Sequence, residues 1–295
     1  MPETKRRSSI PLVAFAAILW GTTGLAGRLL TEHYLVSPLC VAGWRLAVAA
    51  PALLLWERLR RGGSVPVPRL GAAWKWFAVY GVAVALYQVS FFSAIDLAPV
   101  SGATIVTLCL APVVVLLLAP VLLSERLNSK TLGVVALAIV GTMLVVGLDG
   151  LTIEGPERTG YALALVAAVC YALYNICGKK LVVGFSPEFV ISRVFTLGAL
   201  LLSPTLFRTP ALPLEGWACI AYLGLVPSAL AYGLFQTGLS SCKATSSSVA
   251  SLLEPLTSAT LAVLFLGETL SPTQLVGGGL LVGSIFLLIR VEAAA

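Results

Sequence analysis

The chain consists of long apolar blocks separated by short polar segments. Most blocks run for about 20 residues, which is the length that a helix needs to cross a hydrocarbon core about 30 Å thick. The blocks are Ile10–Leu30, Pro38–Trp56, Trp74–Ile95, Ser101–Ser124, Thr131–Gly147, Gly160–Lys179, Pro187–Phe207, Trp217–Leu239, Ala244–Leu266 and Pro272–Arg290. No barrel-like alternation is present, and an isolated strand cannot satisfy its backbone in lipid. The pattern predicts an all-α integral membrane protein with ten transmembrane helices.

Composition agrees with the membrane class. Hydrophobic residues make up 58% of the chain and charged residues 11%, whereas a soluble domain carries about 25% charged residues. The first block, Ile10–Leu30, is too long for a signal peptide and lacks a small-residue cleavage site, so it is interpreted as an uncleaved span. The six cysteines form no CxxC pair. They are expected to be small buried residues rather than disulfides or metal ligands.

Lysine and arginine in the loops predict the orientation of the spans. With the N-terminus inside, only Arg28, Arg158 and Arg208 fall on the outer side, and Arg45 and Arg193 lie within spans. The other 14 of the 19 basic residues are then cytoplasmic. Both termini are therefore expected in the cytoplasm.

The two halves of the chain are related in sequence. Residues 91–127 align without a gap on residues 234–270, and both segments contain a Pro followed 13 residues later by a Glu. Five spans is an odd number, so the second half must insert upside down. This predicts two inverted five-helix repeats, residues 1–148 and 149–295. Inverted repeats are typical of transporters, with the binding site near the bilayer midplane where the repeats meet.

Several short motifs resemble those of the EamA family of the drug/metabolite transporter superfamily. They are the LWGTTG element at Leu19–Gly24, the Leu-Ala-Pro and Leu-Glu-Pro elements at Leu110–Pro112 and Leu253–Pro255, and the Ser-Glu-Arg-Leu and Gly-Glu-Thr-Leu helix ends. The resemblance covers almost the whole chain. It implies a ten-helix secondary transporter of the bacterial inner membrane, often an exporter of amino acids or other small metabolites. It does not fix the substrate.

Glu254 is the most informative ionisable residue. It lies near the middle of a predicted span, where a charged side chain costs at least ~2.5 kcal/mol. It could contact a cargo ammonium or carry a coupling proton. Alternatively, it could hydrogen-bond backbone that Pro255 leaves without a helical partner. The first-half counterpart is Ala111 beside Pro112, so the proline does not require a carboxylate.

The remaining intramembrane charges occur in both halves. Glu125 and Glu268 stand at equivalent helix ends, where packing or capping of the following helix is expected. Arg45 and Arg193 lie near helix ends, and snorkelling to the interface is the default interpretation. An alternative hypothesis has two equivalent ion pairs, Arg45 with Glu268 and Arg193 with Glu125.

Polar and aromatic residues within spans are candidates for a cargo cavity, because amide and hydroxyl groups between aromatic walls suit a small organic ligand. The predicted substrate-binding residues are Trp20, Thr23, Tyr87, Gln88, Phe91, Tyr171, Tyr174, Asn175, Tyr232, Gln236, Ser248, Ser251 and Glu254. For each residue alone, an interhelical hydrogen bond is the alternative. Spans five and ten are almost free of such groups and are expected to be packing helices.

Enzyme chemistry has little support in the sequence. His33 is the only histidine and lies in a short outer loop, so a histidine-based site would lack partners. No phosphate-binding loop is present, which argues against direct ATP coupling. We expect a monomeric secondary transporter of small zwitterionic metabolites, with amino acids first, that exports them by alternating access. It would use no cofactor, metal or nucleic acid, and a proton is a candidate coupling ion. The alternatives are a carrier for nucleotide sugars, organic phosphates or drug-like compounds, a passive channel, and a membrane enzyme.

Overall fold

The fold is known from a computed structural model that describes residues 9–61, 70–98, 100–125, 129–146, 157–266 and 271–293. All regular structure within these residues is helical. In this part of the chain, eight helical segments are long and apolar enough to cross a membrane, and two further apolar helices, Ile10–Gly21 and Ser129–Leu144, are shorter. The chain is thus a multi-pass membrane protein, as predicted. The count of ten spans stays a prediction.

Each predicted block coincides with one helix or with a set of consecutive helices. The unbroken helices are α3 (Pro38–Arg61), α4 (Trp74–Leu97), α5 (Val100–Leu123), α6 (Ser129–Val146), α7 (Glu157–Leu181), α8 (Pro187–Leu206) and α13 (Pro272–Ala293). The broken ones are α1 (Ile10–Gly21) with α2 (Thr23–Arg28) and η1 (Leu29–His33), α9 (Leu214–Gly224) with η3 (Leu225–Leu230) and α10 (Ala231–Ser241), and α11 (Ala244–Ala250) with α12 (Leu253–Leu266). A short 3-10 turn, η2 (Gly71–Ala73), precedes α4.

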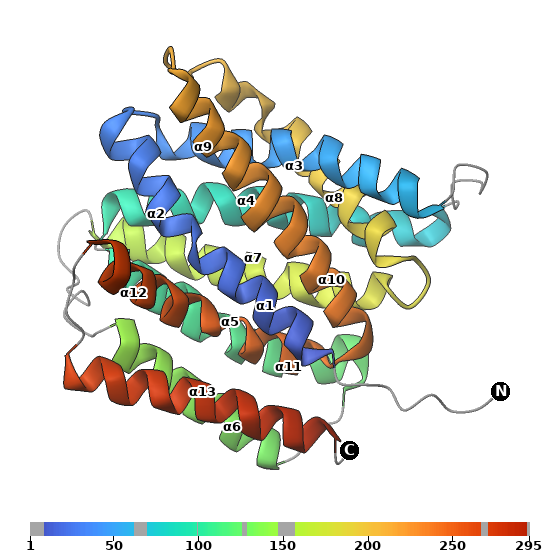
Figure 1. The fold of residues 1–295 in the computed structure, drawn as a ribbon. Helices are drawn as coiled ribbons and strands as arrows, with labels where there is room; N and C mark the ends of the chain where they lie inside the picture. The colour runs from blue at the N-terminus through green and yellow to red at the C-terminus, as the bar shows by residue number, and fades with distance from the viewer. Residues whose placement is uncertain are drawn as a thin grey trace.

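The helices form one bundle (Figure 1). α3 packs against α8 at one edge, and α6 packs against α13 at the opposite edge. Between these pairs, α4 packs on α7, and α1 packs on α10 and α12. The start of α1 and the end of α13 lie on the same side of the bundle, here called the termini side, and η1 lies on the other, here called the far side (Figure 1).

Glycines set several of the helix crossings. A Cβ at Gly233 of α10 would lie 2.0 Å from the Trp56 ring of α3, and a Cβ at Gly141 of α6 would lie 3.0 Å from the backbone of α13. Any larger side chain would push these helices apart. At the edge pair α6–α13 the close approach includes Gly277, which belongs to the glycine run of the predicted tenth span.

Candidate functional site

A cavity of about 400 Å³ lies in the middle of the bundle and extends toward the far side. This volume falls within the range of roughly 300–1,000 Å³ that is usual for small-molecule sites. The aromatic lining residues are Trp20, Tyr87, Phe91, Phe92, Tyr171, Tyr174 and Tyr232, and the polar ones are Thr23, Thr31, Glu32, Arg45, Gln88, Thr104, Glu254 and Ser258. Among the described residues, neither α6 nor α13 contributes to the lining. This agrees with their predicted role as packing helices.

The break between α1 and α2 brings Trp20 and Thr23 to the cavity. Thr22 separates the two helices, and its hydroxyl donates to the Leu19 carbonyl over 2.7 Å. Beside it, Gly21 lies directly against α12, because a Cβ there would be 2.5 Å from Cβ of Thr257. The glycine of the Trp-Gly-Thr-Thr element therefore lets α1 touch α12, and Trp20 and Thr23 of the same element line the cavity.

The break between α11 and α12 brings Glu254 to the cavity. Ser251 and Leu252 separate the two helices, and Glu254 stands in the first turn of α12. Pro255 is tolerated there because the first N–H groups of a helix have no intrahelical acceptor. The positive end of the helix dipole favours a carboxylate at this position. Within the described chain, no hydrogen bond joins the Glu254 side chain to the backbone around Pro255, so that explanation of the residue finds no support.

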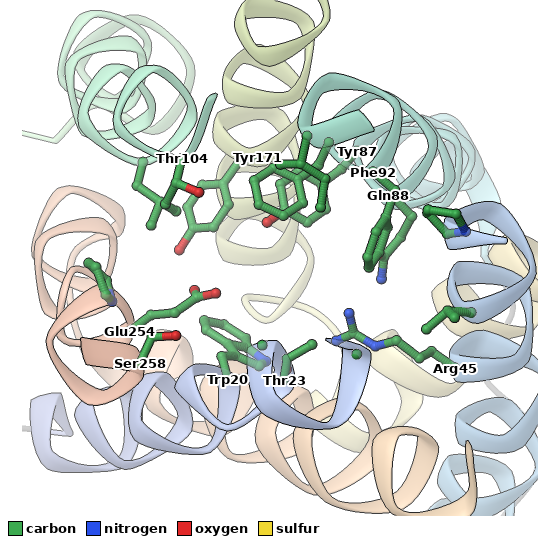
Figure 2. A pocket seen from close by; sticks show the side chains of 18 of the residues that line it. Trp20, Thr23, Arg45, Tyr87, Gln88, Phe92, Thr104, Tyr171, Glu254 and Ser258 are labelled. Atoms are coloured by element: carbon green, nitrogen blue, oxygen red, sulfur yellow. The ribbon is translucent and has the colours of Figure 1, made fainter. Parts of the chain in front are cut away.

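Arg45 of α3 also reaches the cavity. Its side chain is buried, and Figure 2 shows the guanidinium pointing into the space beside Thr23 and Gln88. Its Nε donates to Ser228 Oγ over 3.2 Å, and Ser228 in turn donates to the Leu223 carbonyl. Ser228 lies in the π-helical turn η3 beside Pro227, where the chain departs from the α-helical ladder. The interpretation of Arg45 as a snorkelling side chain was therefore wrong.

The cavity wall is an aromatic cluster. Trp20 lies 4.8 Å from Tyr232, and Tyr171 lies 4.7 Å from Tyr174, measured between ring centroids. Tyr87 contacts Tyr171 at 5.9 Å. Such pairs fix ring orientations and add roughly 0.5–1.5 kcal/mol each beyond their buried area. The wall is therefore largely apolar, with a few polar atoms at defined places.

Several of those polar atoms have no hydrogen-bond partner among the described residues. They include Trp20 Nε1, Thr23 Oγ1, Gln88 Nε2, and the hydroxyls of Tyr171 and Tyr174, all on residues that line the cavity. A buried polar group left unsatisfied costs about 1–3 kcal/mol, so proteins rarely keep such groups without a reason. Five such atoms around one cavity make it a candidate site for a polar ligand.

The structure brings nine of the thirteen predicted site residues to the cavity: Trp20, Thr23, Tyr87, Gln88, Phe91, Tyr171, Tyr174, Tyr232 and Glu254. The other four lie nearer the termini side and do not line it. Asn175 Oδ1 accepts from the Ser247 hydroxyl over 3.0 Å, Gln236 accepts from Tyr80 and donates to the Gly178 carbonyl, and Ser251 donates to the Ser247 carbonyl. Ser248 is buried, and its hydroxyl has no partner within the described chain.

Sequence reasoning missed four lining residues that matter chemically, namely Arg45, Phe92, Thr104 and Ser258. Thr104 and Ser258 are single hydroxyl groups in apolar helices, and such groups usually bond to their own backbone. Phe92 adjoins a predicted residue and carries no polar atom. For Arg45 a signal was present, because an arginine seven residues inside a span is costly.

A layer of polar contacts closes the bundle on the termini side. Glu125, directly after α5, accepts hydrogen bonds from the backbone N–H groups of Ala244 and Thr245, at 2.6 and 3.4 Å, and from the Thr245 hydroxyl at 3.2 Å. Lys179 Nζ donates to the Leu239 carbonyl at the end of α10 over 2.9 Å. These contacts tie α5 and α7 to the corner between α10 and α11, and we call them the seal.

The partners of Glu125 and Arg193 correct the ion-pair hypothesis. Glu125 caps α11, 119 residues further along the chain, rather than the following helix or Arg193. Arg193 instead pairs with Glu57 over 3.2 Å, and the Ser192 hydroxyl donates to the same carboxylate over 2.6 Å. Glu57 lies just beyond the predicted span Pro38–Trp56, and α3 continues past it to Arg61. Glu268 lies outside the described residues.

Comparison with known proteins agrees with this architecture. The model of the EamA-like transporter family matches residues 7–147 and again residues 158–290. An uncharacterized transporter, YwfM, of Bacillus subtilis is 30% identical, over 90% of this chain and 88% of its own length. A probable amino-acid metabolite efflux pump of Salmonella typhimurium is 28% identical, over 94% of this chain and 93% of its own. A probable terminal-alkyne amino-acid exporter of Streptantibioticus cattleyicolor is also 28% identical, over 96% of this chain and 89% of its own.

A solved crystal structure shares the fold, with a TM-score of 0.82 and 21% identity over 97% of this chain and 99% of that one. The family and the named relatives are transporters, which confirms the prediction that the chain is not an enzyme. The two family matches together cover most of the sequence, and the chain belongs to the EamA-like transporter family.

Proposed function

We propose that this protein is a secondary active transporter that exports small zwitterionic metabolites, with amino acids first, by alternating access. The observation that carries the proposal is the central cavity, in which one carboxylate and one guanidinium face a common space between aromatic walls. A cargo with one positive and one negative group matches this pair of charges. Two relatives whose names refer to the efflux or export of amino acids support the cargo class.

The proposal includes two inverted five-helix repeats, residues 1–148 and 149–295. The packing supports it. Equivalent helices of the two halves pair with each other, α3 with α8 and α6 with α13. The contact of α4 with α7 has its counterpart in the contact of α10 with α1. A family model that matches once in each half is consistent with the same relationship.

In this proposal the protein lies in the bacterial inner membrane with the termini side facing the cytoplasm, because basic residues are concentrated on that side. The cavity then reaches outward to Glu32, which is exposed on the far side, and the seal faces the cytoplasm. With this orientation, the described conformation would be outward-facing. Export requires the seal to open, admit cargo from the cytoplasm and close again.

Counterflow in proteoliposomes tests the proposal. Vesicles containing the purified protein and an unlabelled compound are diluted into a trace of the same compound in labelled form, at two pH values. We expect transient accumulation of label with at least one amino acid, and a pH-dependent rate if a proton is coupled. Exchange only with nucleotide sugars or organic phosphates would replace the cargo class, and non-saturable flux would indicate a channel. Light scattering of the solubilised protein tests the expected monomer.

A further inference from the structure

Resting on the proposed function, we infer that the cavity binds a zwitterionic cargo in one orientation, with its carboxylate at Arg45 and its ammonium at Glu254. The two charged residues come from different repeats and point into the same space from opposite sides (Figure 2). Within the described chain they form no ion pair with each other. The space between them is therefore available to a molecule that carries both charges.

The Arg45 end of the cavity is rich in nitrogen donors. The Gln88 side chain points toward the guanidinium, and Trp20 lies between Glu254 and Thr23, with Thr23 on the side of Arg45 (Figure 2). Trp20 Nε1 and Gln88 Nε2 have no partner in the part of the chain that the structure describes, and an indole N–H can only donate. Buried N–H donors without an acceptor are costly. A carboxylate, which accepts through two oxygens and binds arginine in a fork, completes such a site.

The Glu254 end has the opposite character. The hydroxyl groups of Thr104, Tyr171 and Ser258 surround the Glu254 carboxylate, and they come from α5, α7 and α12 (Figure 2). Tyr171 OH has no hydrogen-bond partner in the described structure. An ammonium group is a donor with three N–H bonds and no acceptor. An array of oxygen atoms around one carboxylate suits an ammonium and offers nothing comparable to a second carboxylate.

Different contacts fix the charged residues at the two ends of the cavity. Ser228 holds Arg45 through its hydroxyl, and the Ser228 hydroxyl is itself fixed by donation to a backbone carbonyl. Glu254 is held by its place in the first turn of α12. The cargo backbone would lie along the line between them, which leaves its side chain against the aromatic wall around Tyr87 and Phe92. Recognition of both backbone charges would then be strict, whereas side-chain selection would depend on apolar fit.

Competition against counterflow tests the orientation. Leucine is the probe, or the amino acid that the screen selects, and the competitors are its amide, which lacks the carboxylate, and its N-acetyl form, which lacks the ammonium. Hydrogen bonds to a charged group contribute enough for about tenfold or greater discrimination. We expect each competitor to inhibit the wild type at least tenfold more weakly than leucine.

The variants separate the two ends. In Arg45→Gln, the inhibition constants of leucine and its amide should differ by no more than about threefold, while the N-acetyl form should still inhibit weakly. In Glu254→Gln, leucine and its N-acetyl form should inhibit about equally, while the amide should still inhibit weakly. Arg208→Gln and Glu215→Gln are matched controls, because both residues lie outside the cavity lining and should leave both ratios unchanged. If Arg45→Gln does not fold, Arg45→Lys keeps the charge without the planar fork and should retain a reduced preference for the acid.

The outcomes distinguish the two proposals. Wild-type exchange of no amino acid or other zwitterion would overturn the proposed function. Normal amino-acid exchange without discrimination against the amide and the N-acetyl form would overturn the orientation alone. The same conclusion would follow if Arg45→Gln and Glu254→Gln altered both ratios equally.

Discussion

The seal provides a perturbation whose size can be worked from the contacts. Glu125→Ala removes three hydrogen bonds, to the N–H groups of Ala244 and Thr245 and to the Thr245 hydroxyl. Loss of a helix N-cap costs about 0.5–2 kcal/mol, and hydrogen bonds to a charged group contribute about 1.5–3 kcal/mol when buried. Glu125 is only partly buried, so its contribution is discounted for solvent screening. We expect the closed seal to lose about 2 kcal/mol, which is about 30-fold in the opening equilibrium.

Hydrogen exchange of the backbone amides measures this opening directly. Residues 244–247 at the start of α11 should exchange about 30-fold faster in Glu125→Ala, because their protection depends on the cap. Glu125→Gln keeps one acceptor oxygen and should give a smaller increase. Glu188→Ala is the matched control, since Glu188 is a carboxylate at the start of another helix, α8, and is not part of the seal. Unchanged protection of residues 244–247 in Glu125→Ala would refute the capping role.

Three further predictions concern packing and binding. Gly21→Ala should lower the melting temperature in detergent, because the new Cβ would lie 2.5 Å from Thr257, whereas Gly27→Ala, where nothing lies within 4 Å, should not; equal effects would contradict the close contact of α1 with α12. Glu57→Gln should cost about 1–3 kcal/mol of stability in a denaturant titration, since it weakens a buried carboxylate's contacts with α8; a neutral result would show that the pair is not structural. Trp20→Phe keeps the aromatic packing and removes one unpartnered donor, so cargo affinity in counterflow should fall about 5- to 10-fold with little change in melting temperature; full retention would exclude the indole N–H from binding.

The helices and much of the cavity could be predicted because membrane insertion leaves a direct record in sequence. Apolar blocks mark the spans, and polar residues inside them stand out against the cost of burial. The comparison of the two halves selected Glu254, since its counterpart is Ala111. The structure then placed Glu254 in the cavity lining.

What could not be predicted depends on partners distant in sequence. An amide or hydroxyl within a span can face a ligand or another helix, and only the packing decides. Asn175 and Gln236 bond to other helices, whereas Gln88 faces the cavity. The capping role of Glu125 could be predicted only by knowing that the start of α11 lies beside the end of α5. Arg45 was misinterpreted because its position near a helix end permits snorkelling, while its actual neighbour Ser228 is 183 residues away.

The central claim is that the cavity is the cargo site, and cysteine accessibility at Ser258 tests it most directly. Ser258 lines the cavity on α12, so the Ser258→Cys variant in right-side-out vesicles should react with a membrane-impermeant maleimide added outside. Leu214→Cys is the reference, because Leu214 is 81% exposed and lies outside the cavity lining. We predict that an exchanging amino acid slows labelling at position 258 in proportion to its occupancy and leaves position 214 unchanged. Labelling at position 258 that is the same with and without saturating cargo would contradict the account.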